Sequence, residues 1–190
     1  GQETVRHFFR AGGSSGTIAK AMSAYDKDFS DAIYGVEEDG RYVTESRLKK
    51  MLSHEVSLIE KRLSREKHPN QMFFSYANTV ATIDFAKQFK GHGWVGIRYQ
   101  IEPDEDYNEI VIHIRFKETD VKLQQETLGI LGVNLIYGAF YKYNDSKKLL
   151  RYLYDHLDKD QLEIDTINFS GPRFADVDNR LMSLQLVKYG

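Results

Sequence analysis

The chain has 190 residues and contains no cysteine. This absence excludes disulfide bonds, thiolate metal sites and thiol catalysis, and it fits a reducing compartment. An excess of charge of one sign is also missing, because 26 lysines and arginines face 28 aspartates and glutamates, a net charge of -2. Such a balance argues against non-specific binding to nucleic acid or to an anionic membrane, so we expect neither as a partner.

Proline and long apolar runs are scarce as well. The chain has 3 prolines and no linker-like or low-complexity segment. Its most apolar stretch, residues 128–141, includes Asn134 and three glycines and is shorter than the roughly 18 residues of a spanning helix. No signal-peptide core opens the chain, so we expect a cytoplasmic location. The length predicts a single domain over 1–190, and the abrupt ends suggest that it is excised from a longer protein.

The spacing of apolar residues predicts both helices and strands. Helical spacing covers 17–34, 44–65, 121–141, 146–157 and 176–189, although Leu184 and Leu186 also alternate as in a strand. Strand-like segments cover 5–11, 72–84, 94–102, 108–117 and 162–169. The links between the three middle strands are too short for parallel crossovers. The sequence therefore predicts an α+β fold, with helices packed on a largely antiparallel mixed sheet and one strongly apolar helix buried.

The apolar helix over 121–141 contains residues that such a helix seldom carries. Gly129, Gly132 and Gly138 each lower helix propensity by roughly 1 kcal/mol, so we interpret them as places where another backbone comes close. Asn134 is interpreted as a buried, hydrogen-bonded packing residue.

A glycine-rich turn is the first candidate site. A strand, then this turn, then a helix is an arrangement that holds anions, because free amide hydrogens and the positive end of the helix dipole meet there. Hydroxyl and ammonium groups add further donors. The candidate ligand-binding residues are Gly12, Gly13, Ser14, Ser15, Gly16, Thr17 and Lys20.

The turn matches no known nucleotide fingerprint. A Walker loop requires Gly-Lys-Ser/Thr, whereas Thr17 follows Gly16 here, and the adjacent pair Gly12-Gly13 breaks the Gly-x-Gly-x-x-Gly pattern. The alternative is a plain strand-to-helix turn in which Ser15 or Thr17 caps the helix.

The second candidate site is one face of the central strands. Strand alternation places Arg98, His113 and Arg115 on one sheet surface, with Trp94 near its edge. Arginines bind phosphate or carboxylate bidentately, and a histidine could act as general acid or base. A stripe of small residues in the strand over 72–84 could leave room for a ligand. The alternative is a solvated face with weak cross-strand ion pairs.

Other signals are weaker. His92 lies between two glycines and is either a loop histidine at a ligand mouth or a plain turn residue. His54-Glu55 begins a metalloprotease-like string, but Leu58 stands where the second histidine belongs, and we expect no metal. No catalytic residue and no cofactor is assigned.

Four strings carry a resemblance: FFRAGGSSGTIAKAMSAYDKDFSDAIYG, HGWVGIRYQ, LGILGVNLIYGAFY and DNRLMSLQLV. They resemble the N-terminal part of a family of longer proteins from Bacteroidetes and cyanobacteria, which carries the names nicotinate-nucleotide adenylyltransferase and TonB-dependent receptor. The resemblance implies a fragment of a longer cytoplasmic protein. It implies no catalytic residue, because the His-x-x-His-type nucleotide motif is missing from this sequence.

Two functions follow from these observations. In the first, a cytoplasmic domain binds a phosphorylated, nucleotide-like small molecule through the glycine-rich turn and the Arg98/His113/Arg115 face, with phosphoryl or nucleotidyl transfer as a compatible reaction. In the second, the chain is a non-catalytic interaction or oligomerisation domain. The apolar helix, together with the 12 tyrosines and 11 phenylalanines of the whole chain, then serves packing and subunit contacts.

Overall fold

The computed structural model describes residues 2–86 and 88–189, with side chains in the last helix described as far as Leu186. The helices are α1 (Gln2–Ala11), α2 (Lys27–Tyr34), α3 (Glu45–Arg62), α4 (Val121–Tyr141), α5 (Ser146–Leu153) and α6 (Asn179–Tyr189). The strands are β1 (Phe74–Ala81), β2 (His92–Tyr99), β3 (Asn108–Phe116) and β4 (Leu162–Ser170). Two short 3₁₀ turns, η1 (Ser14–Gly16) and η2 (Pro172–Phe174), complete the order.

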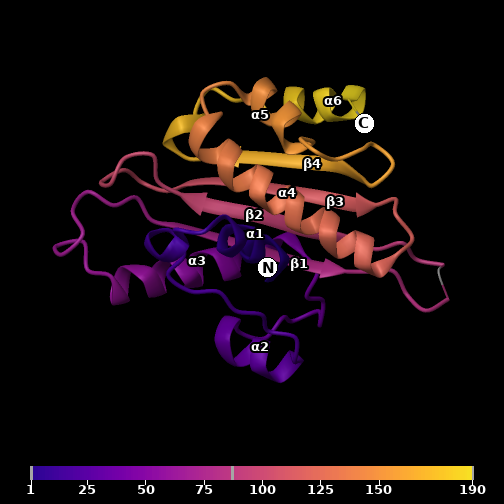
Figure 1. Cartoon of the computed structure of the whole chain (residues 1–190), viewed down its shortest axis with the longest axis horizontal. Helices are drawn as coiled ribbons and strands as arrows, with labels where there is room; N and C mark the ends of the chain where they lie inside the picture. Colours follow the sequence, from indigo (N-terminus) through magenta and orange to yellow (C-terminus); the bar gives the residue numbers. More distant parts are fainter. Residues whose placement is uncertain (1, 87, 190) are drawn as a thin grey trace.

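The strands form one antiparallel sheet of four strands in the order β1-β2-β3-β4. Figure 1 shows α4 crossing one face of this sheet, α5 and α6 beside it near β4, and α3 behind the opposite face. The segment with α2 lies beyond the β1 edge (Figure 1). The expected α+β fold with a largely antiparallel sheet is confirmed. Residues 179–189, whose alternation also allowed a strand, form helix α6.

The two faces of the sheet differ in character. On the face beneath α4, the side chains of Ile97, Ile110 and Ile112 are fully buried in the main core. The opposite face, which we call the polar face, carries Trp94, Arg98, Val111, His113 and Arg115. There α3 packs Leu48 and Leu52 on Ala77 and Val111. Beyond α3 the β4 residues Glu163, Asp165, Thr166 and Asn168 remain half-buried, and Ser170 at the end of the strand is exposed.

Helix α4 is buried on several sides, as its composition predicts. Asn134 lies in the core and donates hydrogen bonds to the Leu153 carbonyl (3.0 Å) and the Asp155 carbonyl (2.7 Å), so its expected packing role is confirmed. None of the described helices, α4 included, is long and apolar enough to span a membrane.

Only one of the three α4 glycines faces another backbone. A Cβ at Gly129 would lie 3.2 Å from the carbonyl oxygen of Glu3 in α1. At Gly132 a Cβ would meet the side chains of Thr4 and Tyr76, and at Gly138 that of Leu149. Our interpretation of all three as backbone contacts is therefore wrong for Gly132 and Gly138, where side chains occupy the space.

The N-terminal region differs most from the expectation. Residues 5–11 belong to helix α1, not to a strand, because Thr4 and Phe8 lie one helical turn apart and pack toward α4 and the core. The helix expected over 17–34 begins only at Lys27, where Asp26 Oδ1 accepts a hydrogen bond from the Phe29 amide at 2.8 Å. Residues 18–25 form neither helix nor strand.

Candidate functional site

The sequence-predicted residues of the sheet do share the polar face, but they lie toward opposite ends of it. Register pairs Arg98 with Glu109 and His92 with Arg115. The small-residue stripe of β1 lets α3 pack closely on the sheet, and Ser75 Oγ donates to the Leu52 carbonyl at 2.9 Å. Three residues of the stripe, Ser75, Ala77 and Thr79, nevertheless line a large cleft, but Arg98, His113 and Arg115 do not.

Arg98 is occupied by protein partners. Its Nη1 donates to Glu109 Oε2 at 3.1 Å, and its guanidinium lies over the Tyr107 ring, 5.1 Å from the centroid. This is the cross-strand ion pair that stood as the alternative for this face.

At the other end, a β-bulge brings together a histidine, an aspartate and an arginine. His113 lies opposite Thr166 and Ile114 opposite Ile164, so Asp165 is an extra residue in β4. A bulge re-aims the side chain that it inserts. Asp165 Oδ1 lies 2.7 Å from His113 Nδ1, and Asp165 Oδ2 accepts from Arg115 Nε at 2.8 Å.

Asp165 was not among the residues predicted from the sequence, although a signal for it exists. The apolar side chains of this strand run Leu162 and Ile164, then Ile167 and Phe169, a shift of phase by one residue. Because strand alternation has a period of two, such a shift marks a bulge between the two pairs.

His92 completes the cluster, which we call the histidine chain: Asp165, His113 and His92. His92 Nδ1 lies 2.8 Å from His113 Nε2. The Trp94 ring flanks His113 at a centroid distance of 4.7 Å, and Phe89 contacts His92 edge-on at 5.9 Å. His92 is the first residue of β2 and therefore not a plain turn residue.

The hydrogen bonds determine where the imidazole protons sit. An ionised carboxylate only accepts, so neutral His113 must carry its proton on Nδ1. His113 Nε2 is then an acceptor, and the Nδ1–H of His92 donates a hydrogen bond to it. With both rings neutral, His92 presents an unprotonated Nε2.

The environment favours a neutral His92 and an ionised Asp165. Burial lowers the pKa of His92 below its ordinary 6.5, and the nearby His113 and Arg115 lower it further, whereas Asp165 raises it. Burial raises the pKa of Asp165, but hydrogen bonds from His113 and Arg115 outweigh that effect and leave the pKa below its ordinary 3.8. Near neutral pH, Asp165 is therefore ionised and His92 is neutral.

Two groups of this cluster have no partner among the described residues. One is His92 Nε2, and the other is the pair of terminal nitrogens of Arg115, which uses only Nε toward Asp165. The Arg115 side chain is 62% exposed. Register makes His92 and Arg115 direct cross-strand neighbours, and Arg115 is one of the charges that lower the pKa of His92, so a proton acceptor and a cation stand on paired residues.

The glycine-rich turn lacks the architecture predicted for it. It follows helix α1 and enters η1, whose first flanking residue Gly13 has φ 68°, and no α-helix begins there. The expected strand-to-helix anion pocket is therefore wrong, because it requires the N-terminus of a helix. Lys20 is paired with Glu55 Oε2 at 3.0 Å.

Part of that turn lines a large cleft. The cleft has a volume of about 1740 Å³ and runs between residues 15–27, α3 and the outer edge of β1. Of the predicted residues, it is lined by Ser15, Gly16, Thr17 and Lys20. Arg98, His113 and Arg115 do not line it, so the two predicted sites are separate.

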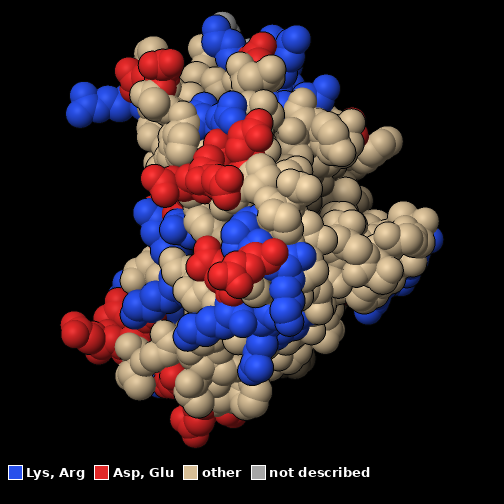
Figure 2. All heavy atoms as spheres, turned by 90° about the vertical axis from the view of Figure 1, so that its left-hand side faces the viewer, with Lys and Arg blue, Asp and Glu red and all other residues tan. Residues whose placement is uncertain are grey.

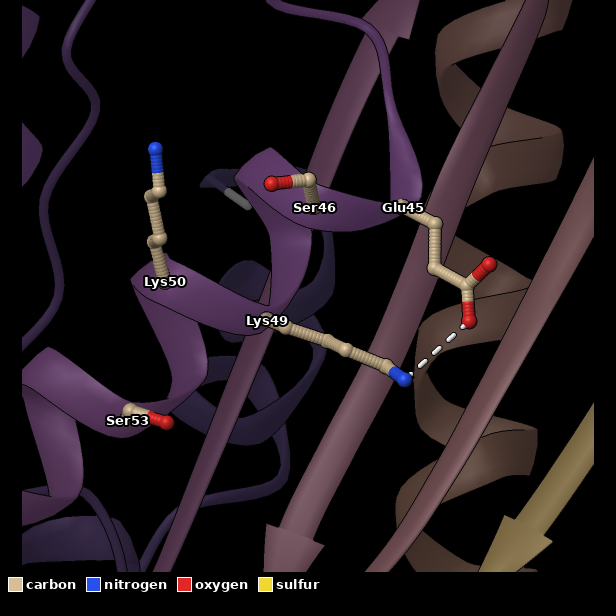
Figure 3. Close-up of a pocket in the computed structure, with 5 residues that line it drawn as sticks. All are labelled: Glu45, Ser46, Lys49, Lys50 and Ser53. Atoms are coloured by element: carbon tan, nitrogen blue, oxygen red, sulfur yellow. Dashed lines mark ion pairs between the residues drawn. The ribbon is translucent and has the colours of Figure 1, made fainter. Parts of the chain in front are cut away.

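A shallow depression on α3 is a weaker candidate. It is lined by Glu45, Ser46, Lys49, Lys50 and Ser53. Figure 3 shows Lys49 pointing to Glu45, with the two charges 3.2 Å apart, and Lys50 pairs with Glu37 at 3.1 Å. Both lysines are thus occupied by carboxylates.

Charge elsewhere is mixed. Figure 2 shows acidic and basic side chains interleaved on the face at the left of Figure 1, with no field of one sign. Within residues 2–86 and 88–189, no group of three or more His, Asp or Glu side chains could hold a metal ion. In the histidine chain both nitrogens of His113 and Nδ1 of His92 are already hydrogen-bonded, which leaves only His92 Nε2.

Comparisons with known proteins add no relative: no family model, no curated protein and no solved structure matches the chain.

Proposed function

We propose that this domain binds a phosphorylated small molecule at the polar face, where Arg115 and His92 are cross-strand partners. The observation that supports the proposal is the pair of unpartnered groups, the Arg115 terminal nitrogens and His92 Nε2. A guanidinium edge matches two phosphate oxygens, and such charge-assisted hydrogen bonds are among the strongest that proteins form. Nucleotides are the first ligands to test, since one name of the resembling family is that of a nucleotide enzyme. We also propose a cytoplasmic location, where such ligands are abundant.

The proposal is tested by calorimetric titration with inorganic phosphate, ATP and a sugar phosphate. We expect Arg115→Gln to weaken binding about 10- to 100-fold, the value of one or two charge-assisted hydrogen bonds. Arg98→Gln is the matched control, because Arg98 lies on the same face but already pairs with Glu109.

A third variant tests the other predicted site. Lys20→Gln removes the cation next to the glycine-rich turn. Loss of binding in this variant but not in Arg115→Gln would move the ligand to the cleft and refute the polar-face site. Absence of binding by any phosphorylated compound would refute the proposed function.

One observation favours the second candidate function, self-association. Tyr137 and Tyr141 of α4 are 44% and 69% exposed, and the Tyr137 ring stacks on both Tyr141 (4.6 Å) and Tyr152 (5.0 Å). Exposed aromatic clusters are typical of subunit contacts. Sedimentation over a range of concentrations tests this, with Tyr141→Ser expected to shift the equilibrium to the monomer.

A further inference from the structure

We infer that His92 Nε2 is the proton acceptor in hydrolysis of a phosphate ester at this site, with Asp165 and His113 as positioning residues. This inference rests on the proposed function, because it requires a phosphorylated ligand at Arg115. It goes further in naming a reaction, a substrate class and the atom that receives the proton.

The direction of the hydrogen bonds fixes the tautomers of the two neutral rings. Asp165 accepts from His113, which accepts from His92, so each neutral ring can hold its proton only on Nδ1. The lone pair of His92 Nε2 is the result of this chain. A histidine in a solvated turn would instead distribute its proton between both nitrogens.

That lone pair belongs to the residue paired with Arg115 across β2 and β3. His92 and Arg115 are cross-strand partners, and Arg115 is itself held by the second oxygen of Asp165 at 2.8 Å. One carboxylate therefore orients both the base, through His113, and the cation. In the proposed complex a phosphoryl group binds the terminal nitrogens of Arg115, and the cross-strand neighbour His92 deprotonates the attacking water molecule.

The proposed reaction is the hydrolysis of a phosphate ester by one water molecule. His92 Nε2 takes a proton from water, the water oxygen bonds to phosphorus, and the bond from phosphorus to the ester oxygen breaks. The alcohol leaves with a proton returned through solvent, and inorganic phosphate is released. The imidazolium formed on His92 is stabilised by the Asp165 charge, transmitted through the hydrogen bonds of His113.

One substitution tests the positioning role directly. In Asp165→Asn, Arg115 Nε still requires an acceptor and draws the amide oxygen to its side. The amide NH₂ then faces His113 Nδ1 and forces the His113 proton onto Nε2. His92 Nδ1 becomes an acceptor, and its own proton moves to Nε2. A single isosteric change thus removes the proposed base without removing a histidine.

Nitrogen-15 NMR of the imidazole rings near pH 7.5 reads these tautomers. We expect Nδ1-protonated His92 in the unmodified chain and Nε2-protonated His92 in Asp165→Asn. Asp160→Asn is the matched control, because Asp160 is an exposed turn residue just before β4. An Nε2-protonated His92 in the unmodified chain, or no change in Asp165→Asn, would overturn the inference.

Turnover is measured with para-nitrophenyl phosphate, whose leaving group requires no proton. We expect His92→Gln and Asp165→Asn each to lower kcat by about 10²- to 10⁴-fold while KM changes much less. His7→Gln, an exposed histidine of α1, should have no effect. Equal turnover in His92→Gln, or phosphate binding without turnover, overturns this inference alone. Absence of phosphate binding overturns the proposed function with it.

Discussion

The guanidinium of Arg47, on α3, donates a hydrogen bond of 2.6 Å to Ser30 Oγ on α2. The same side chain reaches the Gly35 carbonyl at 2.6 Å and Glu37 Oε1 at 3.3 Å, and it lies over the Tyr42 ring. Arg47 is only 1% exposed. One buried cation therefore holds α2 and the loop after it against α3.

Arg47→Ala should destabilise the fold strongly. The substitution leaves Glu37, with a side chain 9% exposed, paired only with the more exposed Lys50. Breaking a buried ion pair costs about 3–5 kcal/mol in the free energy of unfolding, measured here by urea denaturation. Lys49→Ala, which removes an exposed pair on the same helix, should cost less than about 0.5 kcal/mol. Equal losses in both variants would contradict the role of Arg47.

Gly132→Ala should separate α1 from α4. The new methyl group would collide with the side chains of Thr4 and Tyr76, which are 3.3 Å apart and hydrogen-bonded. Overpacking costs about 1–3 kcal/mol of stability. The replacement of a helical glycine by alanine gains roughly 1 kcal/mol in helix propensity, so the net effect is expected to be a loss. Gly16→Ala is the control, because no atom lies within 4 Å of a Cβ there. Thermal denaturation distinguishes the two, and a Gly132→Ala protein as stable as the control would disprove this packing.

Asn134→Ala should loosen the end of α5. Two carbonyl groups, those of Leu153 and Asp155, lose their donor in a buried site. The expected cost is about 1–3 kcal/mol, by chemical denaturation. Gln125→Ala changes an exposed amide of the same helix and should be nearly neutral. A neutral Asn134→Ala would mean that water replaces the amide.

Stability should depend on pH through His92. Its folded-state pKa lies below 6.5 because of burial, then His113 and Arg115, whereas Asp165 acts in the opposite direction. Above pH 6.5 both states are neutral at this ring. As pH falls below 6.5, the unfolded chain binds the proton more readily, so stability decreases until the folded ring is protonated too. We expect the free energy of unfolding, measured by urea denaturation between pH 8 and pH 5, to decrease less steeply with falling pH in His92→Gln than in the unmodified chain. Parallel curves would exclude the pKa shift.

The lowered pKa of His92 also determines at which pH kcat/KM begins to decrease on acidification. If His92 is the base, kcat/KM should decrease only below pH 6.5, where Nε2 becomes protonated. A pH–rate profile with an acid limb above that value would indicate a different base.

Strong periodic patterns predicted the fold well. Helix α4 occupies residues 121–141 as expected, and α3, β1, β2 and β3 differ from expectation mainly at their ends. The failures lie where the pattern is short or interrupted. Residues 5–11 were too few to separate a helical from a strand period, and the capping by Asp26 decided where α2 begins.

The candidate site was predictable only in part. Strand alternation identified His113 and Arg115 correctly as neighbours on one face. It could not pair them with Asp165, which is distant in sequence and reaches them through a bulge. Strand alternation also placed Arg98 in the same site. In the structure Arg98 lies opposite Glu109 and forms an ion pair with it.

Local chemistry along the chain determined the helices, the antiparallel strands and which side chains share a face, because periodicity and short turns act between near neighbours. Tertiary structure alone decided which polar groups meet. Strand register and the extra residue in β4 join Asp165, His113 and His92 into one hydrogen-bonded chain, and these contacts span 52 and 21 residues of sequence. No pattern within a single segment contains that information.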